Sequence, residues 1–155
     1  MEAVLFLIGG RIYTWIELMC RGRTHWTMFL LGGACFVVVG LLNEHQYKWN
    51  QSLLFQSFVG ALLITAMEFL TGCIVNIWLK WQVWDYSNLP FNLLGQVCLY
   101  FFLLWIPMAA ICIVLDDWVR YFLYLELNKI FPWMQKRQRP RYYFLRKEET
   151  RWSQS

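Results

Sequence analysis

The residues of this sequence that could do chemistry are ionisable side chains inside long apolar runs. Glu68 lies within an apolar run that extends from Leu53 to Leu79. An ionised side chain at the centre of a membrane helix costs roughly 2.5–3.5 kcal/mol on insertion scales. Such side chains therefore usually face the protein interior or a water-filled cavity, where they find partners. This makes Glu68 the first candidate for a functional group.

A polar face surrounds Glu68 if this run is helical. Along this run, Thr65, Glu68, Gly72 and Asn76 are separated by three or four residues. Such steps place side chains on one face of a helix. The glycine lets a neighbouring helix approach closely. We therefore expect Glu68 and Asn76 to line a polar cavity inside the protein.

The first apolar run carries a second set of charges. Glu17 and Arg21 form an i,i+4 pair with the acid first, which is the favourable order on a helix. Arg11 is the natural partner for Glu68 if the first and third runs pack together. We expect the countercharge of Glu68 to come from Glu17, Arg21 or Arg11. Such contacts could instead only hold helices in register, but intramembrane ionisable residues are functional by default.

Further polar candidates lie near the ends of the runs: His25, Asp85, Asn92 and Gln96. His25, Glu68 and Asp85 could serve as acids or bases, so a membrane-embedded enzyme acting on a lipid-linked substrate is one alternative. However, the sequence contains no nucleophile elbow, no H-E-x-x-H motif and no zinc-type cysteine spacing. We predict no catalytic residue, no metal and no cofactor.

The elements that position these residues are predicted to be membrane helices. The chain has 155 residues, of which 59% are apolar and 15% charged, against about 45–50% and about 25% in soluble domains. A bilayer core about 30 Å thick needs about 20 apolar residues of helix. Four runs qualify: Ala3 to Cys20, Trp26 to Leu42, Leu53 to Leu79, and Leu93 to Leu115. Continuous runs exclude a barrel, so we predict an all-α, polytopic membrane bundle.

Glycines are the candidate packing residues of these helices. Small side chains let membrane helices approach closely. The candidates are Gly33, Gly40, Gly72 and Gly95.

The segment after Leu115 is apolar but interrupted by charges. We expect residues 116–133 to form a helix in the interface plane and to complete a membrane domain of residues 1–134. Residues 135–155 are basic and are expected to form a cytoplasmic tail. A fifth span is the alternative, since it would place both basic segments of the chain on one side. Four spans are preferred because Arg120 and other polar residues make a fifth expensive.

The connection between the third and fourth runs contains a predicted turn. Pro90 disfavours helix at the residue before it, and Asp85 can bond nearby backbone amides. Trp84 and Tyr86 are expected to anchor this loop at the membrane interface, as aromatic residues do near run ends. We predict that residues 83–92 fold back over the polar cavity, although an exposed connector is nearly as compatible with the sequence.

Three segments, "RGRTHWTMFLLGG", "EFLTGCIVN" and "VWDYSNLPFNLLGQVCL", resemble a family of small bacterial membrane proteins. The family is known as putative ABC-transporter type IV, or CmpB-like, and the resemblance covers about Gly10 to Arg120. Its motif positions fall on Glu17, Arg21, Gly22, His25, Trp26, Glu68, Gly72, Asn76, Trp84, Asp85, Tyr86, Asn92, Gly95 and Gln96. The resemblance implies a permease-like role without naming a substrate.

The sequence also bears on partners and location. No G-x-x-x-x-G-K-[ST] phosphate loop is present, so we expect no ATPase activity and a separate ATPase as motor. Four short spans enclose little volume, so we expect a homo-oligomer or other membrane subunits in the bilayer of the cell membrane. We expect no nucleic-acid partner. A membrane accessory or assembly protein is the main alternative to a transport subunit.

Overall fold

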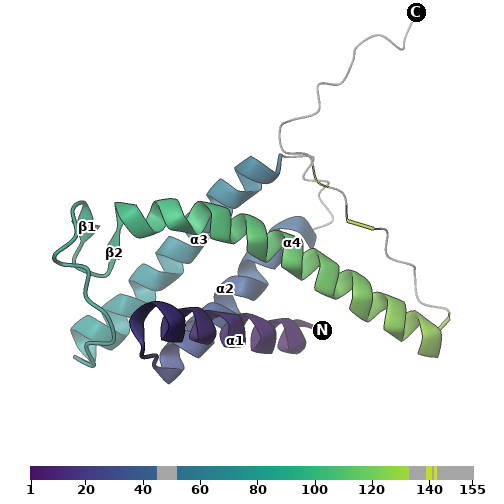
Figure 1. Ribbon diagram of the computed structural model, residues 1–155, viewed down its shortest axis with the longest axis horizontal. Coiled ribbons are helices and arrows are strands. Elements are labelled where there is room, and N and C mark those ends of the chain that lie inside the picture. Colours follow the sequence, from purple (N-terminus) through teal and green to yellow (C-terminus); the bar gives the residue numbers. More distant parts are fainter. Residues whose placement is uncertain (45–51, 133–138, 141, 143–155) are drawn as a thin grey trace, which may run out of the picture.

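The computed structural model describes residues 1–44, 52–132, 139, 140 and 142. Helices dominate it (Figure 1). In chain order the elements are α1 (Glu2–Arg21), α2 (Trp26–Glu44), α3 (Leu53–Gly72), the π-helical η1 (Cys73–Trp78), β1 (Asn92–Leu93), β2 (Val97–Cys98) and α4 (Leu99–Ile130). The predicted all-α class is confirmed, since the two short strands form only a small antiparallel hairpin.

Three helical segments are long and apolar enough to cross a membrane. They are α1, α3 together with η1, and α4, with 20, 26 and 32 residues. The apolar part of α2, Trp26–Leu42, is shorter, but α2 as a whole has 19 residues and lies within the range of about 17–25 that a spanning helix needs. The chain is therefore a membrane protein, with α2 as the shortest of its four helices.

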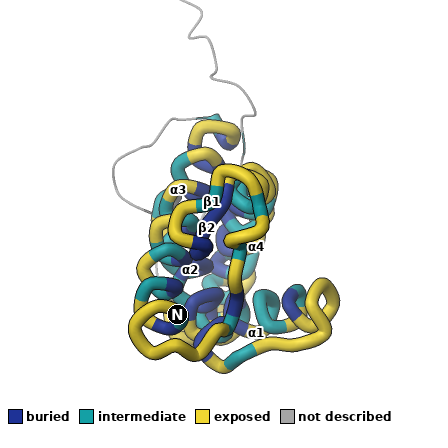
Figure 2. Tube along the Cα trace, turned by 90° about the vertical axis from the view of Figure 1, so that its left-hand side faces the viewer, coloured by how far each residue is buried: buried dark blue, intermediate teal, exposed yellow. Residues whose placement is uncertain are grey.

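The outer faces of the helices are apolar, as expected of surfaces in contact with lipid. Figure 2 shows buried residues on the facing sides of the helices and exposed residues on their outer sides. The exposed apolar side chains include Leu7, Trp15, Leu54, Leu62, Leu70, Leu103, Ile111 and Phe122. The buried core includes Leu31, Val39, Ile64, Ala109 and Ile113, which come from α2, α3 and α4.

Helix contacts are closest between α1 and α2 and between α3 and α4. Gly33 of α2 lies against α1, where an added Cβ would approach the Phe6 carbonyl oxygen to 2.7 Å. Gly40 of α2 lies against α4, where an added Cβ would collide with the Asp116 carboxylate. Glycine is needed at both positions because another helix occupies the space of a side chain.

The fourth helix differs from the prediction at both ends. It begins at Leu99 rather than Leu93, because Phe91, Leu94 and Gly95 all have positive φ and cannot continue a helix. Its 32 residues extend about 48 Å at 1.5 Å per residue, well beyond the bilayer core.

The expected interfacial helix over residues 116–133 is therefore not a separate element. No glycine or proline interrupts the chain near residue 116, and α4 continues through this point to Ile130 without a turn. A separate fifth span would require such a turn. The predicted tail, residues 135–155, lies outside the described residues except for residues 139, 140 and 142. Of these, Tyr142 donates a hydrogen bond to Asp117 at 3.0 Å.

Candidate functional site

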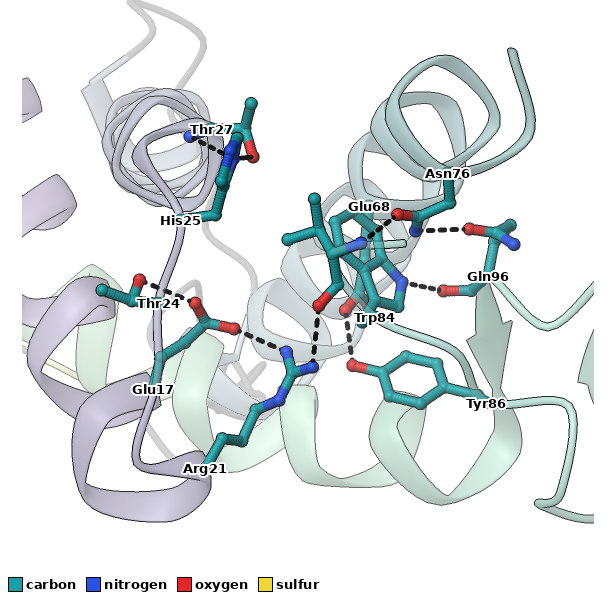
Figure 3. Close-up of polar contacts among 11 residues, drawn as sticks. Glu17, Arg21, Thr24, His25, Thr27, Glu68, Asn76, Trp84, Tyr86 and Gln96 are labelled. Atoms are coloured by element: carbon teal, nitrogen blue, oxygen red, sulfur yellow. Dashed lines mark hydrogen bonds and ion pairs between the residues drawn. The ribbon is translucent and has the colours of Figure 1, made fainter. Parts of the chain in front are cut away.

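Glu68 is almost completely buried, with 1% of its surface exposed. Its two carboxylate oxygens accept hydrogen bonds from two different parts of the chain. The Tyr86 hydroxyl donates to Oε1 at 3.3 Å, and the Trp105 indole of α4 donates to Oε2 at 3.0 Å. Figure 3 shows Glu68 at the centre of a set of polar side chains. Its carboxylate thus joins α3 to the loop before α4 and to α4 itself.

The charged residues of α1 do not pair directly with Glu68. Arg21 donates to the Glu17 carboxylate at 2.9 Å and to the Val83 carbonyl at 3.0 Å, and the second Glu17 oxygen accepts from Thr24 at 2.9 Å. Within the described part of the chain, the hydrogen-bond donors on Glu68 are neutral groups, not an arginine. The predicted Glu17–Arg21 pair therefore forms, but Arg21 also bonds the loop backbone at Val83 and not Glu68.

The prediction that Arg11 pairs with Glu68 is wrong. It is exposed and borders a separate surface hollow of about 330 Å³ that also includes Thr24 and His25. The reason is helical phase: Arg11 directly follows Gly10, so its side chain is turned by about 100° from the buried face that carries Gly10 and Glu17. Knowing which helices pack together does not determine which side of α1 faces inward.

The loop between η1 and α4 folds back onto α3 and η1, as predicted, but it does not cover the polar cavity that was expected there. Asn76 is bonded at both ends of its side-chain amide: its Oδ1 accepts from the Val83 amide at 2.7 Å, and its Nδ2 donates to the Gln96 Oε1 at 2.8 Å. The Gln96 carbonyl in turn accepts from the Trp84 indole at 2.9 Å. Asn76 and Gln96 therefore hold the loop in place instead of lining an open cavity.

Two predictions about this loop were wrong. Trp84 does not anchor it at the membrane interface, because only 2% of the residue is exposed and it packs within the protein core. Gly72 packs against the loop and not against a neighbouring helix. An added Cβ at Gly72 would lie 2.6 Å from Gln96 Oε1 and 3.0 Å from Trp84. The residues of the loop occupy the space that the sequence assigned to helix packing.

The outer turn of the loop is built by residues that the sequence assigned to the cavity or to helix packing. Asp85 accepts a bond from the Ser87 amide at 2.8 Å, and the bonds from the Ser87 hydroxyl and amide lower the pKa of its carboxyl. Asn92 accepts from the Gly95 amide at 3.0 Å and donates to the Leu89 carbonyl at 2.7 Å. Gly95 itself is in a turn with φ +67° rather than in a helix. These side chains shape the loop.

His25 is not brought together with Glu68 or Asp85. Its Nδ1 lies 2.9 Å from the Thr27 hydroxyl, and its ring centroid is 5.5 Å from those of both Trp26 and Trp81. These two tryptophans are exposed, as expected of indoles near the end of a membrane span. His25 is thus part of an aromatic cluster with Trp26 and Trp81. This position gives no support to acid–base catalysis by His25 together with Glu68 and Asp85.

A groove of about 430 Å³ is lined by Tyr86 and Trp105, the two side chains that donate hydrogen bonds to Glu68. Residues of α1, α2, α3, α4 and the loop line it, and its polar or aromatic lining consists of Tyr13, Glu17, Arg21, Tyr86, Phe101 and Trp105, with Phe36 on α2. We refer to this space as the groove. The remaining lining consists of isoleucine, leucine, methionine, cysteine and glycine and is therefore apolar, so the groove differs from the polar cavity expected from the sequence. Glu68 lies behind the Tyr86 and Trp105 side chains that wall the groove.

Two features of the site were missed by the sequence argument. The partners of Glu68, Tyr86 and Trp105, were not identified because no local spacing relates them to it. A second buried charge cluster joins Arg120 to Asp116 at 2.7 Å and to Glu2 at 2.6 and 2.8 Å. Asp116 and Arg120 are four residues apart with the acid first, the same spacing that identified Glu17 and Arg21. This pair could have been predicted in the same way.

The family model described as Putative ABC-transporter type IV matches residues 4–136, which include all but the first two residues of α1, the other three α-helices and the loop. No curated protein and no solved structure matches the chain. The matched region contains every contact described for Glu68, Asn76 and the Glu17–Arg21 pair. The chain therefore belongs to the putative ABC-transporter type IV family, as its three sequence segments indicated.

Proposed function

We propose that this transport-associated membrane protein is a permease-like subunit whose solute occupies the groove. The observation that carries the proposal is the groove itself. Residues of α1 and α4 line it, and two of its lining side chains, Tyr86 and Trp105, are bonded to the buried carboxylate of Glu68. Ligand sites are concave and mostly apolar, with a few polar groups that orient the ligand. The groove has this composition, with Glu17, Arg21 and Tyr86 as its polar groups.

The packing of the helices provides a means to open the groove. Contacts are closest within the pairs α1–α2 and α3–α4, and the groove lies where α1 faces α4. Polar contacts bridge α1 to the rest of the chain at each end: Arg21 bonds the Val83 carbonyl, and Glu2 bonds Arg120 of α4. Releasing one bridge while keeping the other would open the groove toward one side, as alternating access requires.

The motor of such a system is proposed to be a separate subunit, because the chain has no phosphate-binding loop. We expect the tagged protein, purified from native cell membranes in mild detergent, to recover an ATP-binding protein in a defined ratio. Quantitative mass spectrometry of the purified complex measures this, with an unrelated membrane protein carrying the same tag as control. Recovery of an enzyme or receptor instead of an ATPase would favour the accessory or assembly function.

A second prediction concerns Glu68 itself. Glu68→Gln keeps the shape of the side chain, and its amide oxygen can still accept from the Trp105 indole while its NH₂ donates to the Tyr86 oxygen. We therefore expect the variant to fold, with a loss of stability of about 1 kcal/mol or less. If the charge is needed for transport, the variant should fail to complement cells that lack the gene.

The matched control is Glu68→Leu. It removes both acceptors and leaves the buried indole and hydroxyl unpaired, at a cost of about 1–3 kcal/mol for each. Thermal unfolding of the purified proteins separates the two effects. A stable Glu68→Gln protein that complements fully would show that the carboxylate has only a structural role.

A further inference from the structure

We infer that the groove binds a hydrophobic organic cation, such as a lipophilic amine or a quaternary ammonium or phosphonium ion. The inference rests on the proposed function in that it names the class of solute. It depends on the juxtaposition of two stacked aromatic pairs in the groove wall with the buried Glu68 carboxylate, to which one ring of each pair is bonded.

The wall of the groove contains two pairs of rings. Tyr13 stacks on Trp105 with a centroid distance of 6.0 Å, and Tyr86 stacks on Phe101 with a centroid distance of 4.5 Å. All four side chains line the groove. The faces of aromatic rings attract cations, and sites that recognise quaternary ammonium ions are built from several such rings.

One ring of each pair is bonded to the same carboxylate. The Trp105 indole and the Tyr86 hydroxyl both donate to Glu68. Hydrogen bonds of this kind polarise one another in a low-dielectric interior, and donation to an anion moves electron density toward the ring faces. Burial and the charge of Glu68 also raise the pKa of the Tyr86 hydroxyl, so the hydroxyl remains a hydrogen-bond donor.

When Glu68 is ionised, the charges around the groove leave a negative excess. Arg21 is neutralised by Glu17 at 2.9 Å and also bonds a backbone carbonyl. Within the described residues, the donors on Glu68 are two neutral groups, so its charge is not cancelled by an ion pair. A cation against the four rings would supply the missing charge, whereas an anion would be repelled. The aliphatic remainder of the groove suits the apolar substituents of the cation.

The test uses the full chain purified in detergent and radiolabelled tetraphenylphosphonium as probe. We expect saturable binding, with empty micelles as blank. Tetraphenylborate, an anion of the same shape, and neutral triphenylphosphine oxide should each compete at least about tenfold less well. Equal competition by either compound would overturn the proposal, because the groove would then accept apolar molecules without regard to charge.

Two variants locate the site. Glu68→Gln should weaken phosphonium binding by about tenfold or more, and Tyr86→Phe, which keeps the ring and removes one bond to Glu68, should weaken it less. Glu126→Gln removes the same charge from an exposed position of α4 and should leave the affinity unchanged. If Glu68→Gln does not fold, Tyr86→Phe and the competition series still decide the question. Unaltered affinity in Tyr86→Phe and in any folded Glu68→Gln protein would contradict the assignment.

The phosphonium-binding experiment and the ATPase-recovery experiment can contradict their two proposals independently. A protein that recovers an ATPase from native membranes but binds no phosphonium would retain its transport role and lose the cation assignment. A protein that binds phosphonium selectively but recovers no ATPase would retain the site and lose the proposed motor.

Discussion

Arg120→Met is expected to destabilise the protein by about 3–5 kcal/mol, the range measured when one partner of a buried ion pair is removed. Arg120 is 3% exposed and Asp116 is fully buried, so the substitution leaves a carboxylate in the interior without its arginine. The Glu2 side chain is 51% exposed and can return to solvent, so most of the expected loss comes from Asp116. Thermal unfolding of the purified protein in detergent measures it.

A second substitution tests this explanation. Asp116→Asn in the Arg120→Met background removes the carboxylate charge that Arg120 balanced and keeps the side-chain size, which matters because Asp116 packs directly against Gly40. We expect the double variant to recover most of the lost stability. Lys129→Met breaks a pair on the same helix whose side chains are 69% and 68% exposed, and should cost about 1 kcal/mol or less. An Arg120→Met protein that unfolds no earlier than Lys129→Met would contradict the prediction.

Much of the fold was predictable because it depends on local sequence. A continuous apolar run of about 20 residues specifies a membrane helix by itself, and the runs correspond to α1, α2, α3 with η1, and most of α4. The Glu17–Arg21 pair was also predictable, since a four-residue step on a helix brings the two side chains together. Hydrophobicity failed at both ends of α4: the run is apolar at its start but the backbone turns at Leu94 and Gly95, and the helix continues beyond Leu115 to Ile130.

The partners of Glu68 could not be predicted, because they depend on how distant segments meet. Trp105 is 37 positions away along the chain, and Glu2 is 118 positions from Arg120. Charge complementarity suggested an arginine for Glu68, and the structure instead provides an indole and a hydroxyl. Apolar runs reveal which residues enter the membrane but not the rotation of each helix about its axis. That rotation turns Arg11 outward and Glu17 inward.

Gly10→Leu is expected to cost about 3 kcal/mol or more, at the upper end of the effects of overpacking. A Cβ at Gly10 would lie 2.7 Å from the Phe29 carbonyl oxygen and 2.8 Å from its ring. A ring can rotate, but the Phe29 carbonyl belongs to the backbone of the first turn of α2 and can move only if that part of the helix moves. The variant should therefore show less folded protein by size-exclusion chromatography and a melting temperature lower by roughly 6–12 °C.

The contact is reciprocal, which allows a stricter test. Gly10 receives Phe29 of α2, and Gly33 of α2 receives Phe6 of α1, again with a carbonyl oxygen 2.7 Å from an added Cβ. Gly33→Leu should therefore be as damaging as Gly10→Leu. Ala66→Leu adds similar bulk on an exposed position of α3 and should have little effect. If both glycine variants melted like the Ala66→Leu control, the close α1–α2 packing would be incorrect.

The same packing connects helix association to the groove. Gly32 of α2 makes room for Tyr13, since an added Cβ would collide with that side chain, and Tyr13 is the ring that stacks on Trp105 across the groove. The glycine pairs of α1 and α2 thus do two things: they bring the helices together, and they determine how far the Tyr13 ring projects toward α4. Gly32→Ala should displace Tyr13 and weaken phosphonium binding more than Ala66→Leu does, because the added methyl group acts on the wall of the groove.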